Sequence, residues 1–285
     1  MYIFSLDIGS TNIKAIILEI KNDGKEEKIN LIGKVRKKNT DFALFISELF
    51  DEYSIKKELV ENIIVTGTGA SFLDDTYEGI KIIKVDEFDA IGYGGLLLSN
   101  INEAIVVSIG TGTTVIRINL YKNERLTGTG LGGGTFVGLS NAILQNRLVN
   151  DNVKTFNELI EMAKLGNRKN ADLLIGDISK SAIGDMSFDI TAANFAGTNK
   201  TFSENDLIAS VANMIIENIS LIVKGVNKEL PVIYIGTFVS DEYIMNRFKE
   251  LSEYIGNNVV FTNDAAFAIS IGAWEYYLLK LRNEF

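Results

Sequence analysis

The chain has 285 residues, of which 46% are apolar, and its formal charge is −9. That length suits one large or two medium domains, and the acidic charge argues against a nucleic-acid or anionic-membrane surface. Because the sequence contains no cysteine and no histidine, it excludes disulfides, thiolate metal sites and histidine bases, and any acid–base chemistry must use carboxylates, Lys, Tyr or water.

The first predicted strand covers residues 2–6 and ends at Asp7, and a Gly9-Ser10-Thr11 turn leads into a second strand at 15–20. A Gly/Thr turn between the two strands of a hairpin can lie against phosphate groups. Asp7, at the end of its strand, is placed to hold Mg²⁺ directly or through water. The residues alone leave open a second interpretation, in which Asp7 only caps the turn.

The next segments alternate strands with helices. They are a strand at 30–35, a helix from Thr40 or Asp41 to Tyr53, a strand at 62–66, a glycine turn at 67–70, a strand at 80–85 and a helix from Asp86 to about Ser99.

Residues 104–120 repeat the layout of residues 2–20. A strand at 104–109 meets the turn Gly110-Thr111-Gly112-Thr113, and an alternating strand at 114–120 follows. The sequence therefore predicts an internal duplication, with two lobes that clamp a nucleotide between two phosphate turns. We expect the first lobe to cover residues 1–100 and the second to cover 101–285.

The segment from Arg125 to Gly138 carries five glycines between Gly128 and Gly134. A predicted helix over 135–144 follows, so that amides without neighbouring Cβ atoms and a helix N-terminus could close on an anion. The segment is not a P-loop, because no Gly-Lys-Ser/Thr ends it. A flexible loop is the alternative reading of the same residues.

The remainder predicts mainly helices. The expected elements are helices at 156–165 and 172–181, a loop over the cleft at 184–199, a helix at 206–228 capped by Ser203, a strand at 232–235 ending in Gly236-Thr237, a helix at 241–254, a strand at 258–262 and a helix at 264–281. No apolar run approaches the ~18 residues of a membrane span, and the N-terminus does not resemble a signal peptide, so we expect a cytoplasmic protein.

Taken together, these segments resemble the type II pantothenate kinases. The resemblance is carried, in the family's order, by residues 7–14, 86–90, 109–113, 125–136, 161–168, 191–195, 232–237 and 263–273. The phosphate turns alone are shared with sugar, acetate and glycerol kinases and with chaperone ATPases. The glycine run led by Arg125, combined with Glu87-Phe88-Asp89-Ala90, is much more specific.

The resemblance implies an α/β, duplicated actin-like ATPase (ribonuclease H-like) fold. It also implies transfer of the ATP γ-phosphoryl group to the 4′-hydroxyl of pantothenate, the first step of coenzyme A synthesis. Glu87 matches the family's catalytic carboxylate, and we expect Asp86 and Asp89 to raise its pKa. Arg125 matches the arginine that contacts the substrate, and Thr111 lies next to the reacting groups.

The expected cofactors are ATP and Mg²⁺, with Asp7 as the metal ligand. The residues that match the ATP site are Asp7, Gly9, Ser10, Thr11, Asn12, Ile13, Lys14, Gly110, Thr111, Gly112, Gly132, Gly133, Gly134, Thr135, Phe136, Phe156, Gly236 and Thr237. Ser10 departs from the family, which usually has a second glycine there. Residues 184–189 lack the family's proline-containing form.

The expected partners are pantothenate, with pantetheine as a further candidate, and a second copy of the chain bound through the helix at 206–228. Two alternatives stay open: a kinase of the same fold that acts on another small alcohol such as an amino sugar, and a nucleotide-dependent binding or sensor module without acceptor chemistry. The activator ATPases of radical dehydratases share the fold, but they need cluster cysteines that this sequence lacks.

Overall fold

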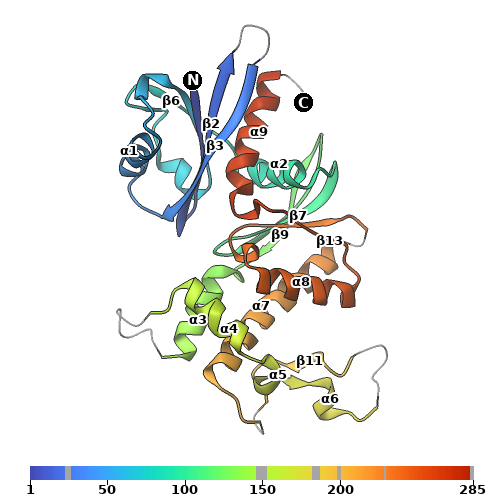
Figure 1. Ribbon diagram of the computed structural model, residues 1–285. Coiled ribbons are helices and arrows are strands. Elements are labelled where there is room, and N and C mark those ends of the chain that lie inside the picture. The colour runs from blue at the N-terminus through green and yellow to red at the C-terminus, as the bar shows by residue number, and fades with distance from the viewer. Residues whose placement is uncertain (23–26, 146–152, 182–186, 198–199, 228, 283–285) are drawn as a thin grey trace.

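A computed structural model describes the chain except for residues 23–26, 146–152, 182–186, 198–199, 228 and 283–285 (Figure 1). The first of its two main sheets has the strand order β3-β2-β1-β4-β6-β5. The first three strands are antiparallel neighbours, and β4 and β6 run parallel to β1. The bounds are β1 (Tyr2–Ile8), β2 (Asn12–Asn22), β3 (Glu27–Lys38), β4 (Val60–Thr66), β5 (Thr76–Tyr77) and β6 (Ile80–Lys84).

The second sheet has the order β13-β12-β7-β8-β9, which matches β6-β4-β1-β2-β3 strand for strand. The internal duplication predicted from the two Gly/Thr turns is therefore confirmed. The strands are β7 (Glu103–Ile109), β8 (Thr113–Asn119), β9 (Asn123–Thr129), β12 (Val232–Ile235) and β13 (Val259–Phe261).

Strand β9 is not among the predicted strands, because the glycines of the segment Arg125–Gly138 favour a loop. In the structure the first residues of this segment belong to β9 and pair with β8, with Arg125 opposite Ile116. Helix α3 (Gly133–Ile143) begins two residues before the predicted start at Thr135. The loop between β9 and α3 is therefore much shorter than the run of glycines predicts.

The helices form layers around the two sheets. Helix α1 (Phe42–Tyr53), which begins at the predicted cap Asp41, packs on one face of the first sheet. Helices α2 (Glu87–Ser99) and α9 (Ala268–Arg282) lie between the sheets, in a core that takes side chains from both. The outer face of the second sheet is covered by α3, α4 (Phe156–Leu165), α7 (Glu204–Val226) and α8 (Glu242–Ile255). Short 3₁₀ helices cover Lys57–Leu59, Thr68–Phe72, Phe238–Ser240 and Ala265–Phe267.

The period-two alternation of β1 determines which side chains face α9. Phe4 and Leu6 belong to the core under α1, whereas Ile3 belongs to the core between the sheets. Ser5 lies on the same face as Ile3, and its hydroxyl donates to the Ser270 carbonyl of α9 at 2.7 Å. By the same alternation Asp7 is on this inner face, at the end where the two lobes meet.

Helix α9 comes last in the chain but packs against α2, β1 and β4. It therefore joins the first sheet to the part of the chain assigned to the second lobe, as Figure 1 shows. The division into residues 1–100 and 101–285 stays a prediction.

Two predictions for residues 166–199 were wrong. The helix expected at 172–181 is reduced to the four residues of α6 (Ile175–Ile178), because Leu173 and Leu174 form β10 and pair with β11 (Thr191–Ala193). The described residues of the expected cleft loop, 187–197, lie with α5 (Arg168–Ala171) at the end of the molecule opposite the first sheet (Figure 1). Residues 184–186, 198 and 199 lie outside the described part.

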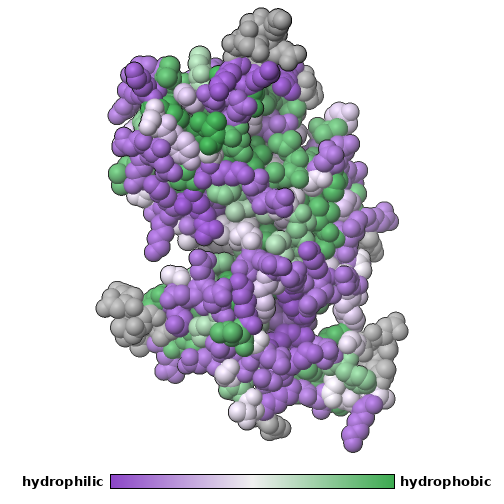
Figure 2. All heavy atoms as spheres, viewed as in Figure 1, coloured by the Kyte–Doolittle hydropathy of each residue, from purple (hydrophilic) through white to green (hydrophobic). Residues whose placement is uncertain are grey.

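Helix α7 begins at the predicted cap Ser203, which forms a capping box with Asp206. By length and composition it passes as a membrane span, contrary to the expectation from the sequence, but 67% of its apolar window is buried. Ile208, Val211, Ile215 and Ile219 all belong to the core of the second lobe. The apolar face expected to form a homodimer is thus largely internal, and the homodimer stays a prediction. Figure 2 shows mainly hydrophilic residues over this half of the molecule.

Candidate active site

A cavity of about 620 Å³ lies between the two lobes and is lined by both Gly/Thr turns. The structure brings fourteen of the predicted site residues to its walls: Asp7, Gly9, Ser10, Thr11, Asn12, Lys14, Glu87, Gly110, Thr111, Gly112, Gly133, Gly134, Phe156 and Thr237. They come from segments that are far apart in the sequence. The duplicated hairpins place the two turns opposite each other.

The two turns contact each other, and each is closed by one backbone hydrogen bond, which spans one residue more in the first turn than in the second. The Gly9 amide donates to the Asn12 carbonyl at 3.1 Å, and the Gly110 amide donates to the Gly112 carbonyl at 2.9 Å. The Thr111 hydroxyl shares hydrogen bonds with those of Ser10, at 3.2 Å, and Thr11, at 3.0 Å. Ser10 therefore supplies a hydroxyl contact between the lobes.

The glycine run closes on the second turn itself. The Gly133 amide donates to the Gly110 carbonyl at 2.8 Å, and the Gly134 amide donates to the Thr111 carbonyl at 2.9 Å. A Cβ on Gly132 would lie 2.7 Å from that same carbonyl oxygen, so a side chain there would separate the two backbones. These glycines thus serve close packing, and two of the helix amides expected to face phosphate are already bonded.

The backbone amides that remain available to bind an anion belong to the two Gly/Thr turns. Within the described residues, no hydrogen bond to the protein is found for the amides of Ser10, Thr11, Thr111 and Gly112. They come from both lobes and lie at the cavity. Converging backbone donors of this kind form an anion-binding concavity.

Asp7 and Lys14 form a buried ion pair at one wall of the cavity. They are cross-strand neighbours in the β1–β2 hairpin, and the Lys14 Nζ lies 2.7 Å from the Asp7 Oδ2. Only 3% of Asp7 and 7% of Lys14 is exposed. Each charge therefore offsets the desolvation of the other.

Glu87 is the first residue of α2, and it lines the same wall. Its N-cap, Asp86, accepts hydrogen bonds from the amides of Phe88 and Asp89. Burial, followed by the nearby charges of Asp7 and Asp86, raises the pKa of Glu87, and Lys14 opposes that shift. A carboxyl group with a raised pKa in a cleft is typical of a general base.

The expected influence of Asp89 on the Glu87 pKa was wrong. Asp89 is not among the charges that shift it, and its Oδ1 instead accepts a hydrogen bond from the Asn123 side chain at 3.0 Å. The burial of Glu87 and its proximity to Asp7 could not be inferred from neighbouring residues in the sequence.

The raised pKa of Glu87 makes a prediction about stability. The ordinary carboxyl pKa is about 4.5, and in the folded state the Glu87 carboxyl keeps its proton to a higher pH than it does in the unfolded chain. The free energy of unfolding therefore falls as pH rises from the ordinary to the raised pKa. Glu87→Gln has no ionisable group at this position and so avoids this loss. The urea concentration at the midpoint of unfolding should therefore be higher for the variant than for the wild type, and this difference should be larger at pH 8 than at pH 5. The same difference at both values would show that the folded protein does not shift this pKa.

Arg125 does not line the cavity. Its side chain is exposed on β9, and its guanidinium carbon lies 5.7 Å from the ring centre of Phe88, the residue after Glu87. The structure thus places Arg125 beside the start of α2 but outside the space that the turns enclose.

The remaining predicted residues are distributed as follows. The side chains of Ile13 and Phe136 are fully buried in the two lobe cores, so only their backbones are available to a ligand. Gly132, Thr135 and Gly236 are not among the residues that line the cavity.

Gly236 packs against the backbone of β7. It has φ of +104°, and a Cβ there would lie 2.4 Å from the Ile109 carbonyl oxygen. Gly236 therefore permits a close approach of two strand ends.

An apolar end of the cavity is formed by Phe156 and Phe238, whose ring centres are 6.1 Å apart. Phe136 lies behind them, with its ring centre 5.8 Å from that of Phe156 and 5.9 Å from that of Phe238. Val137 and Thr237 complete this end. A flat apolar group such as a nucleobase would bury its surface there.

Several lining residues were missed in the sequence. They are Arg36, Thr68, Ile91, Ser108, Thr113, Thr114, Thr129, Val137, Gly138, Phe238 and Ile269. Arg36 lies opposite Lys14 on β3, which continues to Lys38, beyond the predicted end of this strand at residue 35, so no local pattern indicated it.

The donor set at the cavity suits Mg²⁺ bound together with a nucleotide. Within the described residues no group of three or more His, Cys, Asp or Glu side chains could hold a metal by itself. In phosphoryl-transfer sites Mg²⁺ usually takes one or two carboxylates, several waters and phosphate oxygens. Asp7, with Glu87 nearby, meets that requirement.

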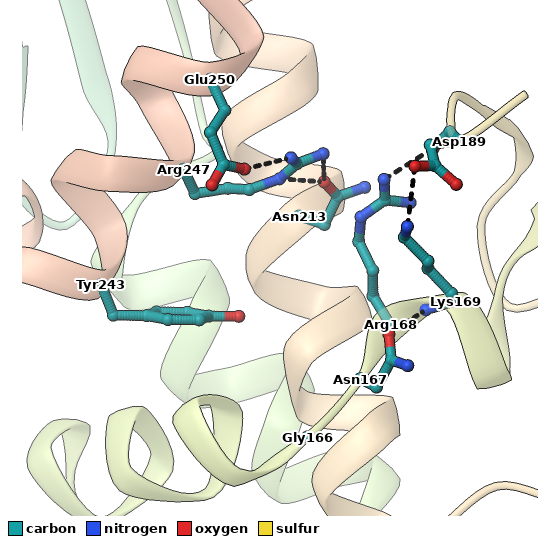
Figure 3. A pocket seen from close by; sticks show the side chains of 9 residues that line it. All are labelled: Gly166, Asn167, Arg168, Lys169, Asp189, Asn213, Tyr243, Arg247 and Glu250. Carbon is teal, nitrogen blue, oxygen red and sulfur yellow. Dashed lines mark hydrogen bonds and ion pairs between the residues drawn. The ribbon is translucent and has the colours of Figure 1, made fainter. Parts of the chain in front are cut away.

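A second cavity, of about 280 Å³, lies beside α5, α7 and α8 (Figure 3). Its cations point toward it but are paired within the protein. Arg247 donates to the Asn213 side-chain oxygen at 2.8 and 2.9 Å and to Glu250 at 2.8 Å, and the Lys169 Nζ lies 2.8 Å from Asp189.

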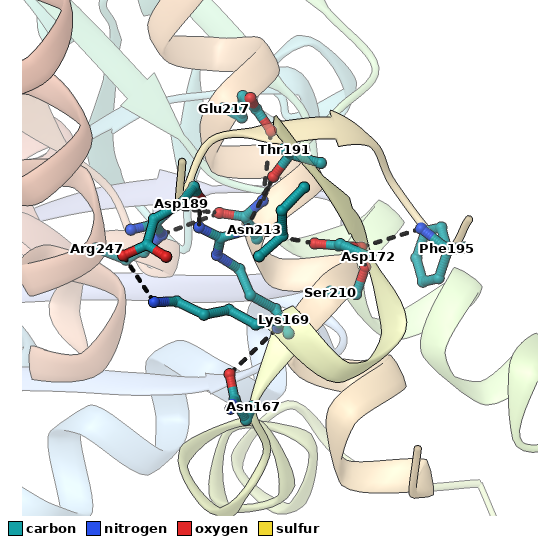
Figure 4. Close-up of polar contacts among 12 residues, drawn as sticks. Asn167, Lys169, Asp172, Asp189, Thr191, Phe195, Ser210, Asn213, Glu217 and Arg247 are labelled. Atoms are coloured by element: carbon teal, nitrogen blue, oxygen red, sulfur yellow. Dashed lines mark hydrogen bonds and ion pairs between the residues drawn. The ribbon is translucent and has the colours of Figure 1, made fainter. Parts of the chain in front are cut away.

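Figure 4 shows the polar network behind this second cavity. Arg168 donates to the Thr191 hydroxyl at 2.9 Å and to the Asp189 carbonyl at 2.8 Å. Asp172 accepts from the Phe195 amide at 3.0 Å and from the Ser210 hydroxyl. These bonds attach α5 and β11 to α7, so the network stabilises the fold, and the interlobe cavity is the candidate active site.

The architecture and the cleft define an actin-like ATPase fold, as comparison with solved structures confirms. An activator of the 2-hydroxyisocaproyl-CoA dehydratase from Clostridium difficile, with bound ADPNP, has a TM-score of 0.65 at 15% identity and covers 100% of this chain and 97% of its own. A ROK family glucokinase from Streptomyces griseus, in complex with glucose and AMPPNP, has a TM-score of 0.57 at 12% identity over 97% of this chain and 99% of its own.

The family follows from the sequence comparisons. The Fumble family model matches residues 99–274, and the chain belongs to this family. A type II pantothenate kinase from Bacillus cereus (strain AH820) is 29% identical over 259 residues, which cover 84% of this chain and 90% of the relative. Another, from Oceanobacillus iheyensis, is 29% identical over 218 residues, covering 72% and 79%. The resemblance to type II pantothenate kinases is confirmed.

Proposed function

We propose that this chain transfers the γ-phosphoryl group of ATP to the 4′-hydroxyl of pantothenate, as the first step of coenzyme A synthesis. The observation that carries the proposal is the position of Glu87, a carboxyl group with a raised pKa in the same cavity as both Gly/Thr turns. The names of the relatives support the choice of acceptor. The nucleotide analogues bound by two structural neighbours support the use of ATP.

The proposed roles follow from the geometry of the cavity. The free amides of the two turns bind the phosphates, and the aromatic end at Phe156 and Phe238 receives the adenine. Glu87 accepts the proton of the acceptor hydroxyl as that oxygen bonds to the γ-phosphorus and the bond to the β-phosphate oxygen breaks, which releases ADP. Mg²⁺, held by Asp7 and the phosphates, would offset the charge of the transferred group.

Arg125 is proposed to assist from the second lobe. Its exposed side chain lies over Phe88, next to Glu87, and its guanidinium can offset the charge that develops on the transferred phosphoryl group. Since it does not line the cavity, this role requires the side chain to turn toward the acceptor.

A coupled assay of ADP release tests the proposal with pantothenate, pantetheine and N-acetylglucosamine as separate acceptors. We expect pantothenate to stimulate ADP release and to give a product phosphorylated on the 4′-hydroxyl, identified by phosphorus NMR. ADP release that is the same with and without acceptor would indicate a nucleotide-dependent binding module. Turnover with N-acetylglucosamine alone would indicate a sugar kinase.

A further inference from the structure

We propose that Arg36 of β3 binds the carboxylate of the acceptor and makes the site selective for acidic alcohols. This inference rests on the proposed function and names a residue that determines its specificity. Arg36 lines the interlobe cavity, although β3 is the edge strand of the first sheet.

The register of the first sheet places Arg36 on the catalytic wall. Asp7 is paired with Thr66 of β4 on one side and with Lys14 of β2 on the other, and Lys14 is paired with Arg36. Residues directly opposite each other on neighbouring strands project from the same face of a sheet. Thr66, Asp7, Lys14 and Arg36 therefore form one polar row across four strands.

Arg36 is the cation of this wall that is free to meet a ligand. Among the described residues that line the cavity, the cations are Lys14 and Arg36 and the acids are Asp7 and Glu87. Lys14 is bound to Asp7 at 2.7 Å. The Arg36 side chain is exposed, and within the described part of the chain it makes no hydrogen bond or ion pair.

Of the three lysines within two residues of Arg36 on β3, two are paired, and the third, Lys38, is exposed but does not line the cavity. The Lys34 Nζ lies 2.6 Å from Asp264, and the Lys37 Nζ lies 2.9 Å from Glu48. An exposed guanidinium that lacks an acid, beside two lysines that have one, is available to an anionic ligand. Its planar donors match a carboxylate through two hydrogen bonds.

The position of Arg36 favours the acceptor over the nucleotide as the source of that anion. The phosphates already have the turn amides of both lobes. Arg36 starts two strands from Asp7, about 10 Å away at ~4.8 Å per strand, on the wall that carries Glu87. In pantothenate the reacting hydroxyl and the carboxylate are at opposite ends of the molecule, so one end can reach Glu87 while the other reaches Arg36.

The test compares Arg36→Gln with the wild type on pantothenate and on pantothenol, in which a neutral CH₂OH group replaces the carboxylate. We expect KM for pantothenate to rise about 10- to 100-fold, the range for loss of a charge-assisted hydrogen bond, with kcat and KM for ATP nearly unchanged. KM for pantothenol should not change. Arg36→Lys should give an intermediate KM for pantothenate.

Lys37→Gln is the matched control, because it removes the same charge one residue along, on the opposite face of β3. Its ion pair with Glu48 is solvent-exposed, so we expect little effect on KM. An equal rise in KM for pantothenol, a rise in KM for ATP instead, or no rise at all would overturn the assignment of Arg36.

Those results would leave the proposed function intact, because the wild type would still use pantothenate. A wild type that does not phosphorylate pantothenate would refute the proposed function, and the assignment of Arg36 with it. Because Arg36 is exposed, the variant should fold, and an unchanged thermal midpoint checks this directly.

Discussion

Replacing Glu87 with Gln should lower kcat by about 10²- to 10⁴-fold, the range typical of general acid–base groups. The amide keeps the size of the side chain but cannot accept the proton of the acceptor hydroxyl. The substitution leaves the turn amides and the aromatic end of the cavity unchanged, so binding of a non-hydrolysable ATP analogue should change little. The measurements are steady-state kinetics with pantothenate and calorimetric titration of the analogue.

Asp89→Asn is the matched control for Glu87→Gln. It removes a carboxylate two residues along the same helix, where the side chain contacts Asn123 and does not line the cavity. We expect its kcat to stay within about threefold of the wild type, since it takes no part in the proton transfer. Near-normal kcat in Glu87→Gln would remove Glu87 from the chemistry.

The pH dependence of the activity should follow the ionisation of Glu87. Protonation of Glu87 removes the base, so kcat/KM should fall as pH decreases through the raised pKa. The inflection should lie above the ordinary carboxyl value near 4.5. An inflection at or below that value would mean that another group controls the rate.

Gly272→Ala should lower the free energy of unfolding by about 1–3 kcal/mol, the usual cost of overpacking a core. Gly272 lies where α9 crosses α2, and a Cβ there would be 1.9 Å from the Ala90 carbonyl oxygen and 2.4 Å from the Gly94 amide nitrogen. Both are backbone atoms, so only a shift of one helix relieves the clash. Urea unfolding followed by circular dichroism measures the loss.

Gly225→Ala provides the comparison for this substitution. Gly225 is also helical, near the end of α7, but a Cβ added there would meet no atom within 4 Å. At this position alanine should stabilise by up to about 1 kcal/mol through helix propensity. If Gly272→Ala is as stable as Gly225→Ala, the contact between α2 and α9 is not the tight crossing seen in the structure.

The clash at Gly272 also connects stability with function. Helix α2 begins at Glu87, so a shift of α2 or α9 would move the carboxylate relative to Asp7 and the turns. We expect Gly272→Ala to lose activity even at temperatures where it remains folded. Catalytic groups tolerate little displacement from their productive geometry.

Much of the fold was predictable from short segments of sequence. The alternating strand at 114–120, the Gly110–Thr113 turn and the helix capped by Ser203 each depend on residues close together in the chain. Turn chemistry, caps and alternation are local properties of the backbone. The repeat of strand, Gly/Thr turn and strand was enough to indicate two similar sheets.

Other features depended on contacts between distant residues. The glycines at 132–134 are predicted phosphate ligands, and the structure adds that they let α3 close on the second turn. Residues 172–181 looked helical, but β10 pairs with β11 instead. In both cases the partner lies elsewhere in the sequence, so no local pattern could indicate it.

By itself, the sequence determined the duplicated hairpins, their Gly/Thr turns and the acidic start of α2, because these depend on glycine, on alternation and on caps within a few residues. Only the tertiary structure decided that Asp7, Lys14 and Arg36 form one row, that Arg125 lies outside the cavity, and that α9 packs between the sheets. Strand register and helix crossings are set by the packing of residues tens or hundreds of positions apart, and one residue of slip would turn each of those side chains to the other face.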